Sequence, residues 1–95
     1  MSTTRIQDGD RCTLKIAGDI DGAATHELAG QVAAEQAGEL MLDFFAVAHF
    51  DDRGLAELAD VLRARGQVSL RGLREHQLRV LAYLGVDAAR ALARH

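Results

Sequence analysis

The chain lacks proline and tryptophan, and among its 95 residues it has one cysteine, one tyrosine and three phenylalanines. The single cysteine, Cys12, excludes an internal disulfide, and its place in an alternating apolar segment predicts a small buried side chain rather than a reactive thiol. No apolar run approaches the roughly 18 residues of a membrane-spanning helix, and the first residues lack the basic and apolar segments of a signal peptide. These absences predict a cytoplasmic protein.

The length and composition predict one compact domain over residues 1–95. Hydrophobic residues make up 48% of the chain, which suffices for a modest core but leaves no room for a second domain. The sequence contains no linker, internal repeat or low-complexity segment.

The net charge of −3 hides an asymmetry between the two halves of the chain. Residues 1–52 carry a net charge of −7, whereas residues 53–95 carry +4, and all the basic residues of the second half are arginines. This division favours a protein that docks onto another protein by charge complementarity over one that wraps a nucleic acid. Five arginines could form a nucleic-acid patch, but they lack interleaved aromatic residues, so the sequence favours a solvated face for them: Arg63, Arg65, Arg71, Arg74 and Arg79.

The first half of the chain predicts a hairpin, a helix and a buried strand. Residues 3–7 and 12–17 are typical strands around the turn at residues 8–10. The first is an edge strand, so a homodimer in which it pairs with a second copy of the chain is an open alternative. Asp21 is suited to cap a helix over residues 23–37, and the apolar residues 40–42 predict a short strand that ends at Asp43.

The second half predicts further helices and one more strand. Apolar spacing indicates a helix from Leu55 that Gly66 stops, and a strand over residues 67–71 follows it. A further helix reaches Gly85. Asp87 is suited to cap a last short helix that runs to Leu92. This order predicts an α/β fold in which a small mixed sheet of about four strands is covered by helices. The strands near residues 42 and 69 should be parallel, with a right-handed crossover between them.

Three motifs in this order resemble those of the STAS domain family, which includes bacterial anti-sigma factor antagonists and the cytoplasmic tails of sulfate transporters. Residues 16–21, Ile-Ala-Gly-Asp-Ile-Asp, resemble the family's Gly-x-Leu-Asp at a strand end. Leu42-Asp43 resembles its Leu-Asp strand end, and residues 50–55, Phe-Asp-Asp-Arg-Gly-Leu, resemble its Asp-Ser-Ser/Thr-Gly-Leu. The resemblance covers about residues 12–86 and implies a STAS-like sandwich.

The resemblance also implies a regulatory site, from which this chain departs at one position. In family members controlled by partner switching, a kinase-fold anti-sigma factor phosphorylates the Ser or Thr that follows the motif aspartate. Here that position holds Asp52, and Arg53 follows it. The partner-binding and regulatory residues that the resemblance implies are Asp21, Asp51, Asp52, Arg53, Gly54 and Leu55.

The adjacent carboxylates Asp51 and Asp52 have two possible roles, as a helix cap and as a fixed charge at the partner-binding surface. Either aspartate can cap the helix that follows, because the free backbone N–H groups there favour an anion. Only one side chain can occupy the cap, so the other, Asp52, is expected to face the partner-binding surface. Its fixed charge would there imitate, incompletely, the charge of a phosphoserine.

Enzymatic and metal-dependent chemistry finds little support in the sequence. Cys12 and Ser69 fall in predicted strands without a paired base, and the four histidines show no metal-ligand spacing. His49 is expected to be a buried or rim histidine satisfied by a backbone group, in preference to a pH-sensing role. Asp43, Asp51 and Asp52 raise the alternative of a magnesium-binding phosphoacceptor cluster, but capping and loop hydrogen bonds account for the same residues. We therefore expect no catalysis, cofactor or metal.

Two classes of function follow from the resemblance. The first is a non-catalytic regulator of transcription that binds a kinase-fold anti-sigma factor or a related ATPase through the start of the helix at residues 52–62. The alternative is a cytoplasmic STAS accessory subunit docked on the ATPase of a lipid-transporting ABC complex. Neither requires nucleic acid or direct insertion into a membrane.

Overall fold

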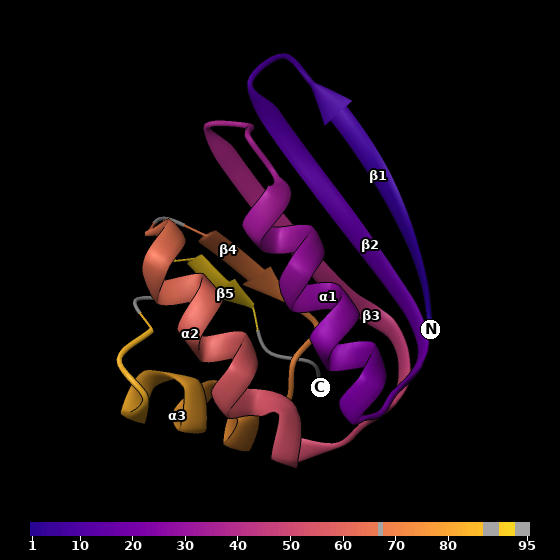
Figure 1. Cartoon of the computed structure of the whole chain (residues 1–95), viewed down its shortest axis with the longest axis vertical. Helices are drawn as coiled ribbons and strands as arrows, with labels where there is room; N and C mark the ends of the chain where they lie inside the picture. Colours follow the sequence, from indigo (N-terminus) through magenta and orange to yellow (C-terminus); the bar gives the residue numbers. More distant parts are fainter. Residues whose placement is uncertain (67, 87–89, 93–95) are drawn as a thin grey trace.

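The fold is a five-stranded mixed sheet with three α-helices, seen in a computed structural model that describes residues 1–66, 68–86 and 90–92 (Figure 1). The elements in chain order are β1 (Ser2–Asp8), β2 (Arg11–Ile20), α1 (Gly22–Ala34), β3 (Glu39–Phe50), the 3₁₀ turn η1 (Asp52–Gly54), α2 (Leu55–Arg65), β4 (Val68–Arg71), α3 (Glu75–Tyr83) and β5 (Arg90–Leu92). The strand order is β1-β2-β3-β4-β5; β1 is antiparallel to β2, and the other neighbours are parallel. The predicted α/β class, mixed sheet, hairpin, edge strand and parallel pairing near residues 42 and 69 are confirmed.

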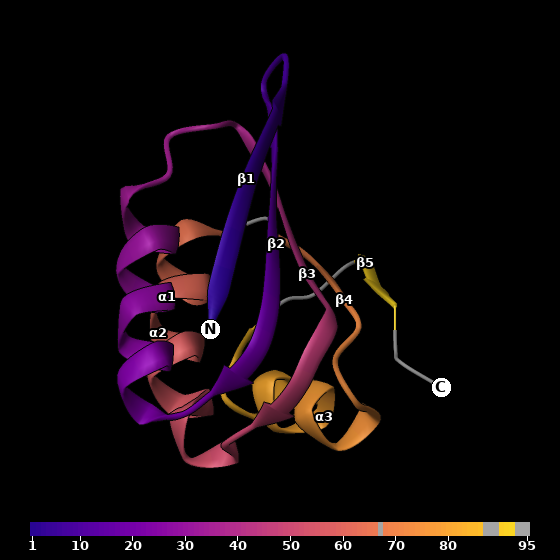
Figure 2. The same cartoon turned by 90° about the vertical axis from the view of Figure 1, so that its right-hand side faces the viewer.

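The helices divide between one face of the sheet and one of its ends. Helices α1 and α2 lie side by side over the same face, whereas α3 lies at the end of the sheet where β3 and β4 finish (Figures 1 and 2). The start of α2 therefore lies near α3, although the two helices start twenty positions apart in the sequence. This end of the molecule holds the motif at residues 50–55.

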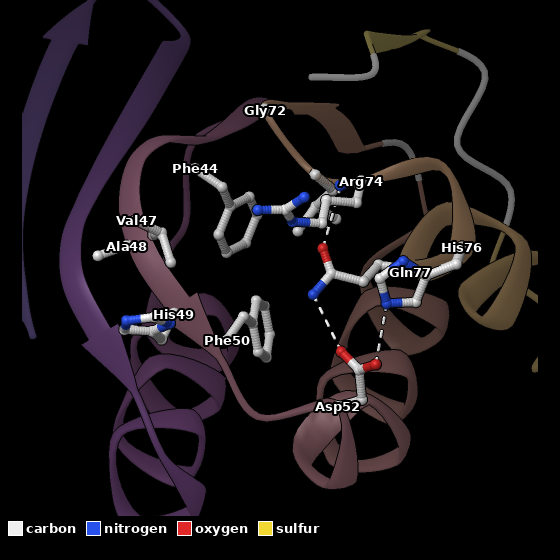
Figure 3. Close-up of a pocket in the computed structure, with 11 residues that line it drawn as sticks. Phe44, Val47, Ala48, His49, Phe50, Asp52, Gly72, Arg74, His76 and Gln77 are labelled. Atoms are coloured by element: carbon white, nitrogen blue, oxygen red, sulfur yellow. Dashed lines mark hydrogen bonds and ion pairs between the residues drawn. The ribbon is translucent and has the colours of Figure 1, made fainter. Parts of the chain in front are cut away.

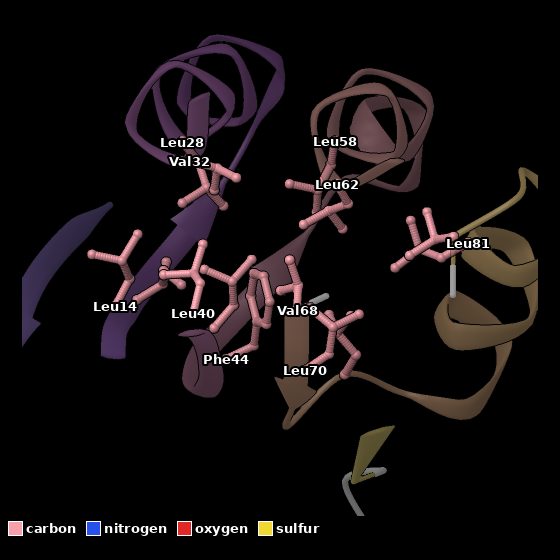
Figure 4. Packing of buried hydrophobic residues seen from close by; sticks show 14 of the residues in the cluster. Leu14, Leu28, Val32, Leu40, Phe44, Leu58, Leu62, Val68, Leu70 and Leu81 are labelled. Carbon is pink, nitrogen blue, oxygen red and sulfur yellow. The ribbon is translucent and has the colours of Figure 1, made fainter. Parts of the chain in front are cut away.

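The core lies between the sheet and the pair α1 and α2. Along β2, Cys12, Leu14 and Ile16 are buried while Arg11 and Lys15 are exposed, as the two-residue period of a half-buried strand requires. The helices contribute the facing side chains, which pack on the strands as Figure 4 shows: Leu28 and Val32 from α1, Leu58 and Leu62 from α2, over Leu14, Leu40, Phe44 and Leu70. The predicted burial of Cys12 is confirmed.

Helix α1 ends at Ala34, three residues before the predicted end. The Glu35 carboxylate accepts hydrogen bonds from the backbone N–H groups of Gln36 and Ala37, and it also binds the Arg5 guanidinium with an Nε to Oε2 distance of 2.7 Å. These bonds replace those of a further helical turn. Asp21 caps the start as predicted, since its Oδ1 accepts from the Ala24 N–H at 2.8 Å.

Strand β3 continues seven residues past Asp43, so the prediction that a strand ends there is wrong. The pairing of β2 with β3 shifts after Lys15 and Asp43, and the Asp43 carboxylate accepts the Phe45 N–H at 3.0 Å at this irregularity. The shift lets the strand run on to Phe50, which pairs with Ile20.

The last predicted helix is also wrong. Residues 90–92 form β5, which pairs in parallel with β4, and Asp87 lies outside the described residues. A short apolar run fits either a helix or a strand, and here the open edge of β4 supplies backbone partners. Among the described residues, no helix has the length and apolar character needed to cross a membrane.

Candidate functional site

The site begins at the end of β3, where the 3₁₀ turn η1 follows the strand. The Asp51 N–H donates to the Ile20 carbonyl at 2.9 Å, which completes the pairing with β2. Asp51 then caps the turn: its Oδ1 accepts from the Arg53 N–H at 3.0 Å, and its carbonyl accepts from the Gly54 N–H. The cap interpretation therefore holds for Asp51.

Asp51 also forms a forked ion pair with Arg53. The Arg53 Nε and Nη2 donate to the carboxylate, with 2.7 Å between Nη2 and Oδ2. The hydrogen bonds from the Arg53 side chain, helped by that from its backbone N–H, lower the pKa of Asp51 to about 2. The Arg53 side chain is 91% exposed, so the pair is presented to solvent at the tip of the turn.

Replacing Arg53 with glutamine should raise the pKa of Asp51 from about 2 toward the ordinary aspartate value of about 4. Because the folded pKa is the lower one, the stability that this pair contributes is present above pH ~4 and is lost as the pH falls from ~4 to ~2. A carboxyl ¹³C NMR titration measures the change. Arg79→Gln, which removes an exposed arginine from another element, should leave the Asp51 titration where it is; an unchanged Asp51 in Arg53→Gln would contradict the assignment.

Three further residues of the predicted site serve the fold. The Asp21 side chain caps the start of α1. Gly54 is buried where the turn crosses α1, and a Cβ at Gly54 would lie 2.8 Å from the Cβ and Cγ2 of Thr25. Leu55 is buried in the core. The exposed part of the motif is thus Asp52 and Arg53, with Asp51 partly exposed beside them.

Asp52 connects the turn to α3. The carboxylate is half-exposed, and both of its oxygens have partners: Gln77 Nε2 donates to Oδ1 at 3.0 Å, and His76 Nε2 lies 2.9 Å from Oδ2 (Figure 3). Gln77 is itself buried, and its Oε1 accepts from the Arg74 N–H at 3.0 Å at the start of α3. The carboxylate is partly open to solvent, but it is held by α3 and is not free.

The contacts of Asp52 favour its ionised form. The hydrogen bond from Gln77, and to a lesser extent that from His76, lowers the pKa of Asp52 although burial and the nearby Asp51 act in the opposite direction. A full negative charge therefore stands at residue 52 at neutral pH.

A cavity of about 240 Å³ opens beside Asp52, between the end of β3 and the start of α3 (Figure 3). Phe44, Val47 and Phe50 contribute apolar walls, with the Phe44 and Phe50 ring centroids 5.8 Å apart. Arg74 and His76 contribute nitrogen donors at its border. The arrangement is able to bind a small molecule or one side chain of a partner.

His49 lines the rim of this cavity, as expected of its position, and its side chain is exposed. No described residue forms a hydrogen bond with its ring, so the expected backbone partner is not observed. 

The five arginines considered as a patch diverge in the structure. Arg63 binds Asp60 and the Leu84 carbonyl, Arg65 binds the Glu35 and Ala37 carbonyls, and Arg71 lies over the Phe45 ring. Arg74 borders the cavity and Arg79 is exposed on α3. The five side chains therefore have different surroundings and do not form one solvated face.

The three aspartates considered for magnesium do not gather. Asp43 lies across from Lys15 and Arg71 in the sheet register, whereas Asp51 and Asp52 follow the end of the same strand. Within residues 1–66, 68–86 and 90–92, no three acidic, cysteine or histidine side chains form a metal-binding group.

Sequence reasoning missed Arg74, His76 and Gln77 as companions of the motif. They lie more than twenty residues beyond Asp52, and only the packing of α3 against the end of the sheet brings them close. The polar first turn of α3 was visible in the sequence but is equally typical of any exposed helix start.

A family model described as "Mlab, STAS domain" matches residues 3–93 of the chain. No curated protein matches it.

Several solved structures share the fold. The unphosphorylated anti-sigma factor antagonist SpoIIAA superposes with a TM-score of 0.73 at 11% identity, covering 99% of this chain and 90% of that one. Phosphorylated SpoIIAA, described as a Bacillus cell fate determinant, gives 0.70 at 12% identity and covers 99% and 92%. An anti-sigma factor antagonist from Mycobacterium paratuberculosis gives 0.69 at 21% identity and covers 99% and 86%. At these identities the likeness is one of fold.

Proposed function

This chain belongs to the STAS domain family, and we propose that it is a non-catalytic regulatory module that binds a protein partner through the turn at residues 51–53. The partner that suits it is a kinase-fold anti-sigma factor or a related ATPase. The proposal draws on the anti-sigma factor antagonists that share its fold.

One observation carries the proposal: the exposed turn presents an ordered set of charges. Asp51 and Arg53 are locked together as an ion pair, and Asp52 is ionised and fixed in position by α3. Charges held in one geometry need little further ordering on binding, so they suit a recognition surface.

In this proposal Asp52 stands where partner-switching relatives have a phosphorylated hydroxyl, so the chain is not switched by phosphorylation at this site. Its carboxylate carries one negative charge, against about −1.5 to −2 for a phosphoserine. The partner therefore meets a permanent charge, and binding is set by the amounts of the two proteins rather than by a kinase.

The test compares the natural chain with Asp52→Ser and Asp52→Asn. Each is incubated with a kinase-fold anti-sigma factor from the same cell and labelled ATP, and the affinity of each for that factor is measured. We expect no phosphorylation of the natural chain, phosphorylation of Asp52→Ser, and for both variants a change in affinity of about tenfold, since a charge-assisted contact is worth about 1.5–3 kcal/mol. Asp52→Asn is the matched control because it removes the charge and offers no hydroxyl. If neither variant differs from the natural chain in either measurement, the proposal is wrong.

The accessory-subunit function is the second candidate. It is favoured by the absence of any serine or threonine in residues 43–66, because a permanently docked subunit needs no phosphorylation switch. The two are separated by the partner: stable association with a transporter ATPase in detergent, unaffected by Asp52→Ser, supports the subunit, whereas residue-52-dependent binding to an anti-sigma factor supports the regulator.

A further inference from the structure

We propose that the cavity between β3 and α3 binds a small organic carboxylate with a flat apolar body, held by Arg74. The cavity borders on Asp52 but not on Asp51 or Arg53 at the charged tip, and the inference does not depend on the proposed function. It rests on the shape of the cavity and on the groups that line it.

The first observation is an arginine that forms no ion pair with a described residue. The Arg74 side chain reaches from the segment before α3 toward the Phe44 ring, across the mouth of the cavity (Figure 3). The Arg74 side chain contacts the Gln77 backbone in the capping box of α3, but among the described residues no carboxylate forms an ion pair with its guanidinium. A planar fork of N–H donors in this position matches the two oxygens of a carboxylate.

The second observation is that the nearby acid is already occupied. The Asp52 oxygens accept from Gln77 and His76, and the Gln77 amide lies between Asp52 and Arg74 (Figure 3). Asp52 therefore does not neutralise the guanidinium by direct contact. A cationic ligand would meet Arg74 and find no free acid, so the cavity favours an anion.

The third observation concerns the apolar wall. Phe44 and Phe50 lie with their ring planes 32° apart, and Val47 adds an aliphatic surface beside them. An inorganic anion would leave this wall in contact with water, whereas a flat hydrocarbon body covers it. The volume of about 240 Å³ is below the 300–1,000 Å³ typical of drug-sized ligands, which limits the occupant to a single ring or a short branched chain.

The test is an NMR titration of the ¹⁵N-labelled chain with sodium benzoate at constant ionic strength and neutral pH. We expect saturable shifts in the Gln77 side-chain amide and in the backbone N–H groups of Arg74 and Phe50. Benzamide, the neutral isostere, and inorganic phosphate, an anion without the apolar body, should each bind at least about tenfold more weakly, because each lacks one of the two interactions.

The matched variants are Arg74→Gln and Arg79→Gln, which remove one arginine from the start of α3 and one from within it. Arg74→Gln should weaken benzoate binding at least about tenfold, since it removes a charge-assisted hydrogen bond, and Arg79→Gln should leave it unchanged. Both variants should keep the fold, because both side chains are exposed and neither forms an ion pair with a described residue. The spectrum of each variant without benzoate checks this.

Several outcomes would overturn the inference. They are the absence of saturable binding up to ~10 mM benzoate, equal affinity for benzamide or phosphate, and benzoate binding that survives in Arg74→Gln. Each is independent of whether the chain binds an anti-sigma factor or a transporter ATPase, so the failure of one proposal is distinguishable from the failure of the other.

Discussion

Replacing Gly72 with alanine is expected to lower the free energy of unfolding by about 2–5 kcal/mol. Gly72 has a φ of +86°, and a Cβ there would lie 2.5 Å from the Phe45 nitrogen and 2.8 Å from the Phe44 carbonyl carbon. The left-handed backbone costs a residue with a Cβ about 1–2 kcal/mol. Displacing the backbone of a central strand adds about 1–3 kcal/mol, since these atoms cannot move aside as a flexible side chain does.

Denaturant unfolding of Gly72→Ala beside Gly66→Ala separates the two costs. Gly66 has a φ of +92° with nothing within 4 Å of its would-be Cβ, so Gly66→Ala should show the backbone cost alone. A larger loss of stability in Gly72→Ala than in Gly66→Ala is the expected sign of the collision with β3. Equal destabilisation would mean that β3 and the segment at Gly72 are not in close contact, and the cavity they border would need a different shape.

Gly54→Ala is expected to destabilise the chain by about 1–3 kcal/mol for a different reason. The φ of Gly54 is −81°, which alanine adopts without strain. The cost comes from Thr25, which is fully buried and would meet the new methyl group with its Oγ1, Cβ and Cγ2 atoms. To admit it, the turn that carries Asp51, Asp52 and Arg53 must move away from α1.

A double-mutant cycle with Thr25→Ala tests this account. Thr25→Ala removes the Oγ1 and Cγ2 contacts. The double variant should therefore lose less unfolding free energy than the two single variants lose together, by at least about 0.5 kcal/mol. Gly30→Ala, in α1 with open space around its would-be Cβ, is the control and should keep or raise stability by up to ~1 kcal/mol. Strict additivity at Gly54 and Thr25 would contradict the close approach.

The local signals in the sequence were sufficient for most elements. Asp21 and Gly66 mark a helix start and a helix end through the backbone groups that they satisfy or the conformation that they adopt, and both act within a few residues. Alternation along residues 12–16 fixes one face of β2 as core. Where local signals were ambiguous, as in the apolar run up to Phe50 and in residues 90–92, the strand pairing partner decided the outcome.

The motif at residues 50–55 shows the same division at the site. From the sequence alone came the position of the two carboxylates, the missing hydroxyl and the capping role of one of them, because a cap and its N–H groups are neighbours in the chain. Only the tertiary structure decided that Asp52 binds His76 and Gln77 and that Arg74 borders the cavity beside it without a described ion-pair partner. Those contacts join residues more than twenty positions apart, and they exist because α3 packs at the end of the sheet where β3 and β4 finish, which no local pattern encodes.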